Sequence, residues 1–386
     1  MENRSDFEVN TGFKVPVIAL TLYAIASGYL MSLIPLMLTE YGIGKSNASW
    51  LASIFYAGLL VGAVIIEPAV KYLGHRFSFI ACLVLFIATI VVLPLAPFVW
   101  VWLVARFIAG VAVAGVFVIV ESWLLVGAES SRAKRLGLYM ASLYGGSALG
   151  QLGIGLLGIE GSAPFIAILS MLVSAILVLS LVPTTQPHSA HSATLSFKQI
   201  TKLNHAAIIG CVVSGLTLGA IYGLMPIELT ARKVSQTDLS LLMALVILGG
   251  MAVQTLVPKL IKIAGRTPLM GLFCLLGLFA VGLVILSDDL VVLAMSLFLI
   301  GMATFALYPI AINLGCDKLD ESFVVSVTQV MLFCYSIGSV SGPMLADWFM
   351  SGSQGLMAYL FATLMATAIY MFIASIRTKK HLVAGE

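Results

Sequence analysis

Two charged residues, Arg106 and Glu121, interrupt an apolar stretch that runs from Phe98 to Gly127. A helix needs about 20 apolar residues to cross the hydrocarbon core of a membrane, so both charges are predicted at or inside the ends of a span. A charge there costs about 2.5–3.5 kcal/mol and usually faces a partner or a wet cavity. At about 100° per residue, both residues share one helix face with Gly110 and Phe117. The pattern predicts one wall of a polar pathway; the alternative is a pair of interface anchors, each reaching its nearer surface.

The composition is that of a protein that crosses a membrane several times. Of its 386 residues, 61% are hydrophobic and 10% are charged, with a net charge of +3, whereas soluble domains carry about 25% charged residues. The N-terminal residues lack the features of a cleaved signal peptide, so the first span is expected to be retained. The five cysteines show no CxxC spacing, and no histidine faces a cysteine or methionine within a span. We therefore expect no metal site and no cofactor.

Apolar segments predict an all-α integral membrane protein of twelve spans. The first six are 15–39, 48–70, 77–96, 98–127, 136–158 and 163–183, and the second six are 206–230, 239–261, 268–287, 290–316, 323–349 and 355–376. A polar segment rich in proline, serine and threonine separates the two sets and is predicted to be a cytoplasmic linker. The predicted domains are a six-helix bundle over 1–183, the linker over 184–204 and a second bundle over 205–386.

Lysine and arginine set the predicted orientation. If the N-terminus is inside, the outer segments hold only Lys45, Arg232 and Lys233 of these residues, and nearly all the others fall in cytoplasmic segments. This asymmetry predicts that both termini are cytoplasmic.

The two halves repeat at an offset of 191 positions. Gly28 matches Gly219, Pro35 matches Pro226, Gly74 matches Gly265 and Gly110 matches Gly301, and one position later Gly146-x-x-x-Gly150 matches Gly338-x-x-x-Gly342. Matches in order at one offset predict two bundles related by a parallel repeat, which is how large secondary transporters are built.

Over nearly its full length the chain resembles the major facilitator superfamily. The loop after span 2 in this family typically reads Gly-x-x-x-Asp-Arg-x-Gly-Arg. In this chain Gly74-His75-Arg76 matches the last part of that motif. Lys71 stands where the Asp is expected, and Glu67 stands where the first Gly is expected. The span-4 motif, an arginine followed by glycines, is similar to Arg106-Phe-Ile-Ala-Gly110. The antiporter motif Gly-x-x-x-Gly-Pro lacks its proline in span 5 and has it in the repeat copy, at Pro343. The run Glu121-Ser122-Trp123-Leu124 is similar to the YcaD-like branch.

The resemblance implies alternating access, with two bundles that rock about a midplane site lined mainly by spans 1, 4, 7 and 10. It also implies a role for Arg106 in proton coupling. Glu121 is the preferred proton carrier because such a carrier needs an acid whose surroundings change during transport.

Further residues are predicted to line the cavity or to gate it. The cavity candidates are Tyr23, Tyr29, Tyr222, Glu228, Tyr308 and Asn313. Hydrogen bonds between helices are the alternative for the uncharged ones, and a carboxylate at the outer rim is the alternative for Glu228. The gating candidates are Glu67, Lys71, Gly74, Arg76 and Asp347. Glu67 and Lys71 have the spacing of a surface or gate ion pair, and Asp347 could cap or gate the outer side.

These features predict a proton-coupled secondary transporter of a small organic solute in a bacterial-type cytoplasmic membrane. Its expected partners are the solute, protons and the lipid bilayer, and it is expected to be a monomer. No HExxH, Walker or GxSxG motif predicts an enzyme, and no basic aromatic patch predicts nucleic-acid binding. Uptake by symport and efflux by antiport remain open, and the rival is a membrane sensor that keeps the carrier fold without transporting anything.

Overall fold

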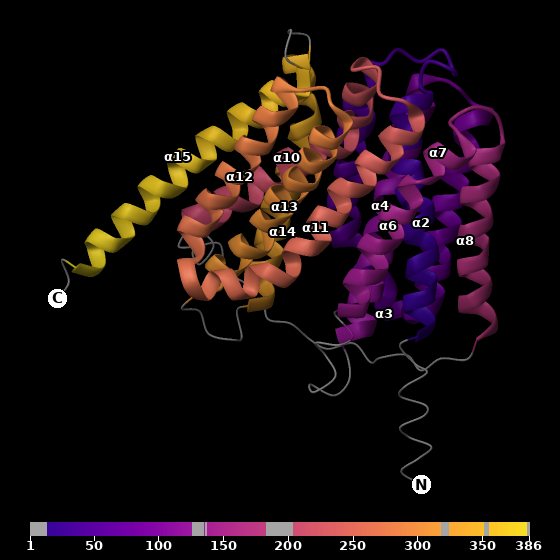
Figure 1. The fold of residues 1–386 in the computed structure, drawn as a ribbon. Coiled ribbons are helices and arrows are strands. Elements are labelled where there is room, and N and C mark those ends of the chain that lie inside the picture. The colour runs from indigo at the N-terminus through magenta and orange to yellow at the C-terminus, as the bar shows by residue number, and fades with distance from the viewer. Residues whose placement is uncertain are drawn as a thin grey trace. The chain divides into compact units, whose positions relative to one another are not determined.

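The computed structural model describes residues 14–125, 135, 137–182, 204–317, 324–350 and 355–383. Side chains are described at these positions except at 67, 71, 125, 324–326 and 377–383. Across this part of the chain all regular secondary structure is helical (Figure 1). The expected all-α membrane fold is therefore confirmed.

Within the described residues, the first half has the following helical elements. They are α2 (Lys14–Met37), α3 (Asn47–Leu95), α4 (Val99–Leu125), the π-helix η1 (Ala141–Gly145), α6 (Gly146–Gln151), α7 (Gly153–Leu157) and α8 (Ala163–Leu181). Those of the second half are α10 (His205–Ala231), α11 (Gln236–Ala264), α12 (Arg266–Leu286), α13 (Leu290–Gly315), α14 (Val324–Met350) and α15 (Gly355–Val383).

Among the described residues, 11 helical segments are long and apolar enough to span a membrane. The long helix α3 supplies two of them, Asn47–Ile66 and Tyr72–Leu95. The 11 segments correspond to all the predicted spans except the fifth.

The fifth predicted span, 136–158, is a broken helix rather than one continuous helix. It passes from the π-turn η1 into α6, is interrupted at Leu152, and ends in α7. Several glycines make this segment a poor helix. Two of them lie against α2: an added Cβ would overlap the Ala24 side chain at Gly146 and the α2 backbone at Gly150. The residues at the junctions, Gly146 and Leu152, keep helical backbone angles, so the segment is an irregular helix that packs closely on α2.

The predicted repeat is visible in the backbone itself. Gly74 interrupts α3 with φ 75° and ψ 164°, and Gly265 precedes α12 with φ 74° and ψ 164°. A positive φ is costly for residues with a Cβ, so the same unusual conformation at equivalent positions is specific evidence for a repeat. The turn between spans 2 and 3 and the turn between spans 8 and 9 therefore have the same backbone conformation.

Backbone-to-backbone contacts between helices also repeat at the offset of 191. A Cβ added to any of four glycines would overlap a carbonyl oxygen of the neighbouring helix. In the first half these pairs are Gly58 with Phe107 and Gly110 with Phe55; in the second half they are Gly249 with Phe298 and Gly301 with Val246. Small residues allow such close packing of membrane helices. Span 2 is thus fixed against span 4, and span 8 against span 10.

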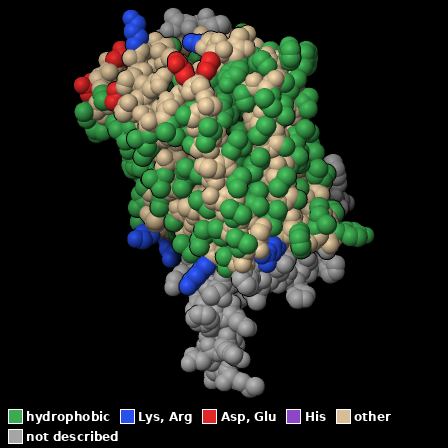
Figure 2. Space-filling model, turned by 90° about the vertical axis from the view of Figure 1, so that its right-hand side faces the viewer, with side chains coloured by type: hydrophobic (Ala, Val, Ile, Leu, Met, Phe, Trp, Pro, Cys, Tyr) green, Lys and Arg blue, Asp and Glu red, His purple; other side chains and the backbone are tan. Residues whose placement is uncertain are grey.

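The chain groups into two compact units, Met1–Ala190 with Val234–Ala244, and His191–Lys233 with Leu245–Glu386. The domain boundaries predicted from the sequence stay predictions, because the unit that holds the first half also includes the start of α11. On the face that Figure 2 shows, hydrophobic side chains cover the middle, acidic side chains gather at one end and most basic ones at the other. This distribution is typical of a protein whose middle lies in lipid.

Candidate functional site

Arg106 lies on α4 against aromatic side chains of the same unit. Its guanidinium carbon Cζ lies 4.2 Å from the centre of the Phe55 ring, an arrangement that gives a cation–π interaction. Its Nε is buried and makes no hydrogen bond, although the residue as a whole keeps some exposed surface. The ionisable groups that interact with it electrostatically are the hydroxyls of Tyr56 and Tyr23. Arg106 is thus a cation held by neutral aromatic groups.

Tyr23, predicted to line the cavity, lies in this aromatic cluster. It is 1% exposed, and its ring centre lies 5.8 Å from that of Phe86 and 6.2 Å from that of Phe117. Spans 1, 2, 3 and 4 of the first unit therefore meet around Arg106 and Tyr23 through aromatic rings.

Glu121 lies far from Arg106 on the same helix. The two residues are 15 positions apart in a continuous helix, and at 1.5 Å per residue this is about 22 Å along its axis. The Glu121 side chain is exposed, and its Oε1 accepts a hydrogen bond of 2.9 Å from the hydroxyl of Tyr139, a buried residue of the fifth segment. The structure therefore does not bring the two predicted coupling residues together. Their role in coupling stays a prediction, and any communication between them has to cross the length of α4.

Two contacts near the ends of α4 and α13 occupy equivalent positions in the repeat. In the first half, Nε2 of His75 lies 3.0 Å from Oγ of Ser122. In the second half, Arg266 donates from Nε to Oδ1 of Asn313 over 2.8 Å. His75 and Arg266 each directly follow a loop glycine, and the two pairs are related by the offset of 191. The first pair joins the helix after its loop to the end of span 4, and the second does the same at span 10.

The predicted cavity residue Asn313 is therefore exposed and bonded to a loop arginine. Arg266 also pairs through Nη1 with Oδ2 of Asp317 at 3.2 Å. The sequence interpretation had missed the partners His75, Ser122 and Arg266. The repeat offset was a signal that could have found them, since it aligns the residues after both loop glycines.

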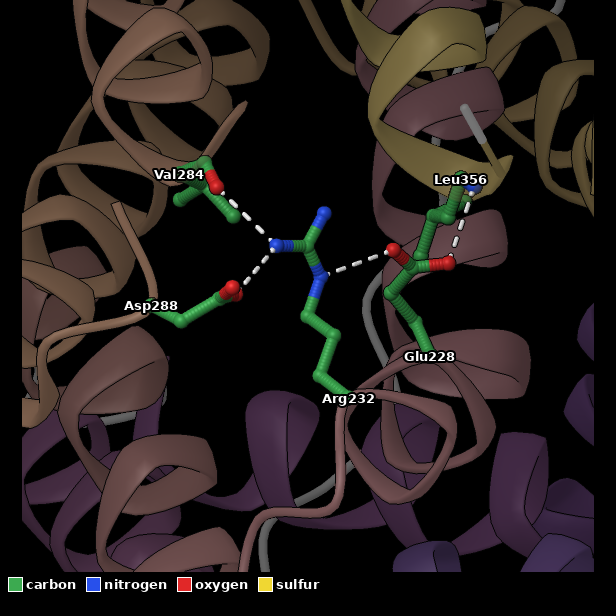
Figure 3. A network of polar contacts seen from close by, with 5 residues as sticks. All are labelled: Glu228, Arg232, Val284, Asp288 and Leu356. Atoms are coloured by element: carbon green, nitrogen blue, oxygen red, sulfur yellow. Dashed lines mark hydrogen bonds and ion pairs between the residues drawn. The ribbon is translucent and has the colours of Figure 1, made fainter. Parts of the chain in front are cut away.

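Glu228 is held in a network of polar contacts at one end of α10 (Figure 3). Its Oε1 accepts a hydrogen bond of 3.0 Å from Nε of Arg232, and its Oε2 accepts one of 3.2 Å from the backbone N–H of Leu356 at the start of α15. Arg232 also donates from Nη1 to the Val284 carbonyl oxygen at 3.0 Å and to Oδ1 of Asp288 at 3.1 Å. The network, which we call the α10 clasp, joins α10 to the end of α12 and the start of α15.

The α10 clasp explains why the carboxylate of Glu228 is tolerated at 7% exposure, because both of its oxygens accept hydrogen bonds. The position equivalent to Glu228 in the first half is Met37, which is apolar and buried. The clasp is therefore a feature of the second half. Glu228 and Arg232 stand at i and i+4, a spacing that predicts ion pairs on helices.

We expect Arg232→Gln to lower the stability of the purified protein by about 1–3 kcal/mol, because it leaves the buried carboxylate of Glu228 without its charged donor. Thermal unfolding in detergent would measure this loss. Lys233→Gln is the matched control, since Lys233 is the adjacent, exposed residue. Equal melting temperatures for the two variants would show that the clasp contributes nothing.

The other predicted site residues lie in separate places. The Tyr29 hydroxyl donates to the Gly158 carbonyl oxygen at 2.6 Å, and Arg76 donates from Nη2 to the carbonyl oxygen of Ser180. Tyr222 packs edge-on against Phe305 with ring centres 6.0 Å apart, and the Tyr308 ring lies 5.0 Å from that of Tyr335. Asp347 is half-buried on α14 and forms no hydrogen bond or ion pair with other described side chains. The side chains of Glu67 and Lys71 lie outside the described set.

The described residues show no cluster suited to a metal ion. No group of three or more His, Cys, Asp or Glu among them could hold a metal ion. Cys316 lies just after α13, and burial raises the pKa of its thiol, so the neutral and less nucleophilic form is favoured. The polar groups found here are suited to holding helices together and to binding a charged group.

Comparison with known proteins identifies the family. Residues 17–343 match the Major Facilitator Superfamily. The chain is 31% identical over 336 residues to an uncharacterized MFS-type transporter of Enterobacter sp. strain 638, covering 84% of this chain and 85% of the relative. It is 29% identical over 369 residues to the uncharacterized MFS-type transporter YcaD of Escherichia fergusonii, covering 95% and 96%.

A solved structure of similar fold is that of a mutant of the nucleoside transporter NupG. Its TM-score is 0.76 at 11% identity, with 94% of this chain and 98% of that chain covered. A likeness at this identity concerns the fold alone, and it agrees with the helical repeat described above. This multi-pass membrane protein belongs to the Major Facilitator Superfamily, whose members are generally secondary carriers.

Proposed function

We propose that this protein is a proton-coupled secondary transporter of a small organic solute. It acts as a monomer in the cytoplasmic membrane of a bacterium, with both termini in the cytoplasm. The observation that carries the proposal is Arg106, a cation in a membrane span whose described neighbours are aromatic rings and phenols. A charge is retained in such a place when it acts on a substrate or an ion.

Glu121 supports proton coupling in this proposal. It is an exposed carboxylate near the end of α4, and its hydrogen bond to Tyr139 links span 4 to the fifth segment. If the fifth segment moves relative to α4 during transport, the surroundings of the carboxylate change, and with them its affinity for a proton. The broken helix at η1 and Leu152 gives this segment a place to bend.

Purified protein in liposomes would test the proposal. A pH difference of two units is imposed, and a mixture of amino acids, sugars, nucleosides, carboxylates and amines is supplied. Mass spectrometry then measures which solutes change in amount inside. One proton per solute supports about 100-fold accumulation or depletion at this gradient, since each pH unit is a factor of about ten. The sign of the change separates symport from antiport, and no gradient-dependent movement of any solute would refute the proposal.

Glu121→Gln is expected to let the transported solute equilibrate across the membrane while abolishing accumulation, because an amide cannot carry the proton. The same liposomes, with and without a pH gradient, measure both properties. Tyr139→Phe is the matched control: it removes the hydrogen bond but keeps the carboxylate, and should retain accumulation with a shifted pH profile. Gradient-driven accumulation by Glu121→Gln at the wild-type level would exclude Glu121 as the proton carrier.

A further inference from the structure

The position of Arg106 along α4 places its Cα inside the apolar layer of the membrane. Helix α4 has 27 residues, so it is about 40 Å long, and Arg106 lies about 10 Å from its start. The hydrocarbon layer is about 30 Å thick. A centred α4 therefore holds the Cα of Arg106 within that layer, where an uncompensated charge is unfavourable.

No described residue supplies a negative charge to Arg106. The described ion pairs all lie in the second unit and involve Arg232 and Arg266. In the first unit Glu121 is about 22 Å away along α4, and the Glu40 carboxylate accepts a hydrogen bond from the backbone N–H of Gly161 in a connecting loop. The tyrosines beside Arg106 are neutral phenols at physiological pH. The site thus has a cation whose counter-ion is not among the described side chains.

Arg106 has a hydrogen-bond donor that no described residue uses. Its buried Nε makes no hydrogen bond, while its guanidinium carbon lies 4.2 Å from the centre of the Phe55 ring, over the face of that ring. The N–H groups of arginine lie in its plane and point outward from its edge, where they bind the two oxygens of a carboxylate side by side. A carboxylate at this edge would satisfy Nε and is compatible with the cation–π contact to Phe55.

The surroundings also indicate the rest of the ligand. Phe55 and Phe117 keep some exposed surface, and Phe117 packs against Tyr23 beside the cation, so an aryl or alkyl body would find apolar partners there. One unpaired arginine balances one negative charge, and a dianion would keep an uncompensated charge in the apolar layer.

We propose that Arg106 with Phe55 forms the binding site for the carboxylate of a small amphipathic monoanion. This inference rests on the proposed transport function and specifies its substrate class. The carboxylate binds at the edge of the guanidinium and supplies the missing counter-ion, while the apolar body packs against the aromatic cluster.

Binding to the purified full-length protein tests the inference without any gradient. The probes are benzoate, 3-phenylpropionate and indole-3-acetate, each paired with its neutral amide, with phthalate as a dianion. Titration calorimetry at neutral pH should show at least one monocarboxylate that binds about ten times or more tightly than its amide, because its hydrogen bonds to arginine are charge-assisted. Arg106→Gln should reduce that carboxylate to the level of the amide, Arg106→Lys should retain part of the preference, and the exposed-site control Lys259→Gln should leave it unchanged.

Either of two results would overturn the inference: no monocarboxylate preferred over its amide by the wild type, or a preference that survives Arg106→Gln in a protein with wild-type melting temperature. Tighter binding of phthalate than of benzoate would overturn the claim that the ligand carries a single negative charge. The proposed function fails separately. If carboxylates bind through Arg106 but no proton gradient drives their uptake or efflux, coupling is wrong and this site stands. If a gradient drives a neutral solute and no carboxylate binds, the coupling stands and this site is wrong.

Discussion

Replacing Arg106 with glutamine is expected to abolish proton-driven accumulation and to leave the purified protein at least as stable as the wild type. Arg106 is the one charge inside the apolar layer that has no acidic partner among the described residues of the first unit. The variant removes this charge, so we expect coupling to be lost. Stability is spared because a charge in the membrane costs about 2.5–3.5 kcal/mol on insertion scales, which exceeds the roughly 0.5–2 kcal/mol of a lost cation–π contact. Solute uptake into liposomes and thermal unfolding of the same preparation measure the two properties.

The combination of results is what identifies the role of Arg106. Lys259→Gln is the control, since it removes one positive charge from an exposed position near the end of α11 and should accumulate solute normally. An Arg106→Gln protein that accumulates solute like the wild type would exclude Arg106 from coupling. A variant that unfolds at a much lower temperature would instead make Arg106 a structural residue.

The second large effect is expected at the glycine contacts between spans 2 and 4 and between spans 8 and 10. Gly110→Ala should destabilise the protein by about 1–3 kcal/mol or more, because the added Cβ would overlap the Phe55 carbonyl oxygen and force the two helices apart. Gly301→Ala should behave alike, since its Cβ would overlap the carbonyl oxygen of Val246. Thermal unfolding and the yield of monodisperse protein in detergent are the measurements.

Gly282 provides the matched control for both glycine variants. It lies on the membrane-spanning helix α12, and nothing lies within 4 Å of a Cβ added there. Gly282→Ala should therefore be neutral or slightly stabilising, by up to about 1 kcal/mol, because alanine loses less conformational freedom than glycine in a helix. If Gly110→Ala and Gly282→Ala melt at the same temperature, the close contact is not needed for stability.

Most of the fold could be predicted from the sequence because the signals are strong and local. Apolar length marks each span, and the repeat offset aligned Gly74 with Gly265 before their shared backbone conformation was known. The irregularities of the fifth segment could not be predicted, because apolar content does not reveal where a glycine-rich helix departs from regular α-helical hydrogen bonding. Its course depends on the packing of Gly146 and Gly150 against α2, a contact between segments far apart in the sequence.

The candidate site was only partly predictable for the same reason. The chemistry of Arg106 follows from a charge in an apolar run, and that is visible in the sequence. Its distance of about 22 Å from Glu121 could also have been calculated from the helical rise. The contacts with Tyr139 and Phe55 could not be predicted, because these residues come from other helices and lie beside α4 only in the folded protein.

The glycine contacts also bear on how the protein can move. Two helices that touch through their backbones have no side chains between them that could change rotamer and let one slide past the other. Spans 2 and 4 therefore form a rigid helix pair, and spans 8 and 10 form the equivalent rigid pair of the repeat. In the proposed transport cycle we therefore expect each helix pair to move as a single body, and we expect bending to occur in less regular parts such as the fifth segment.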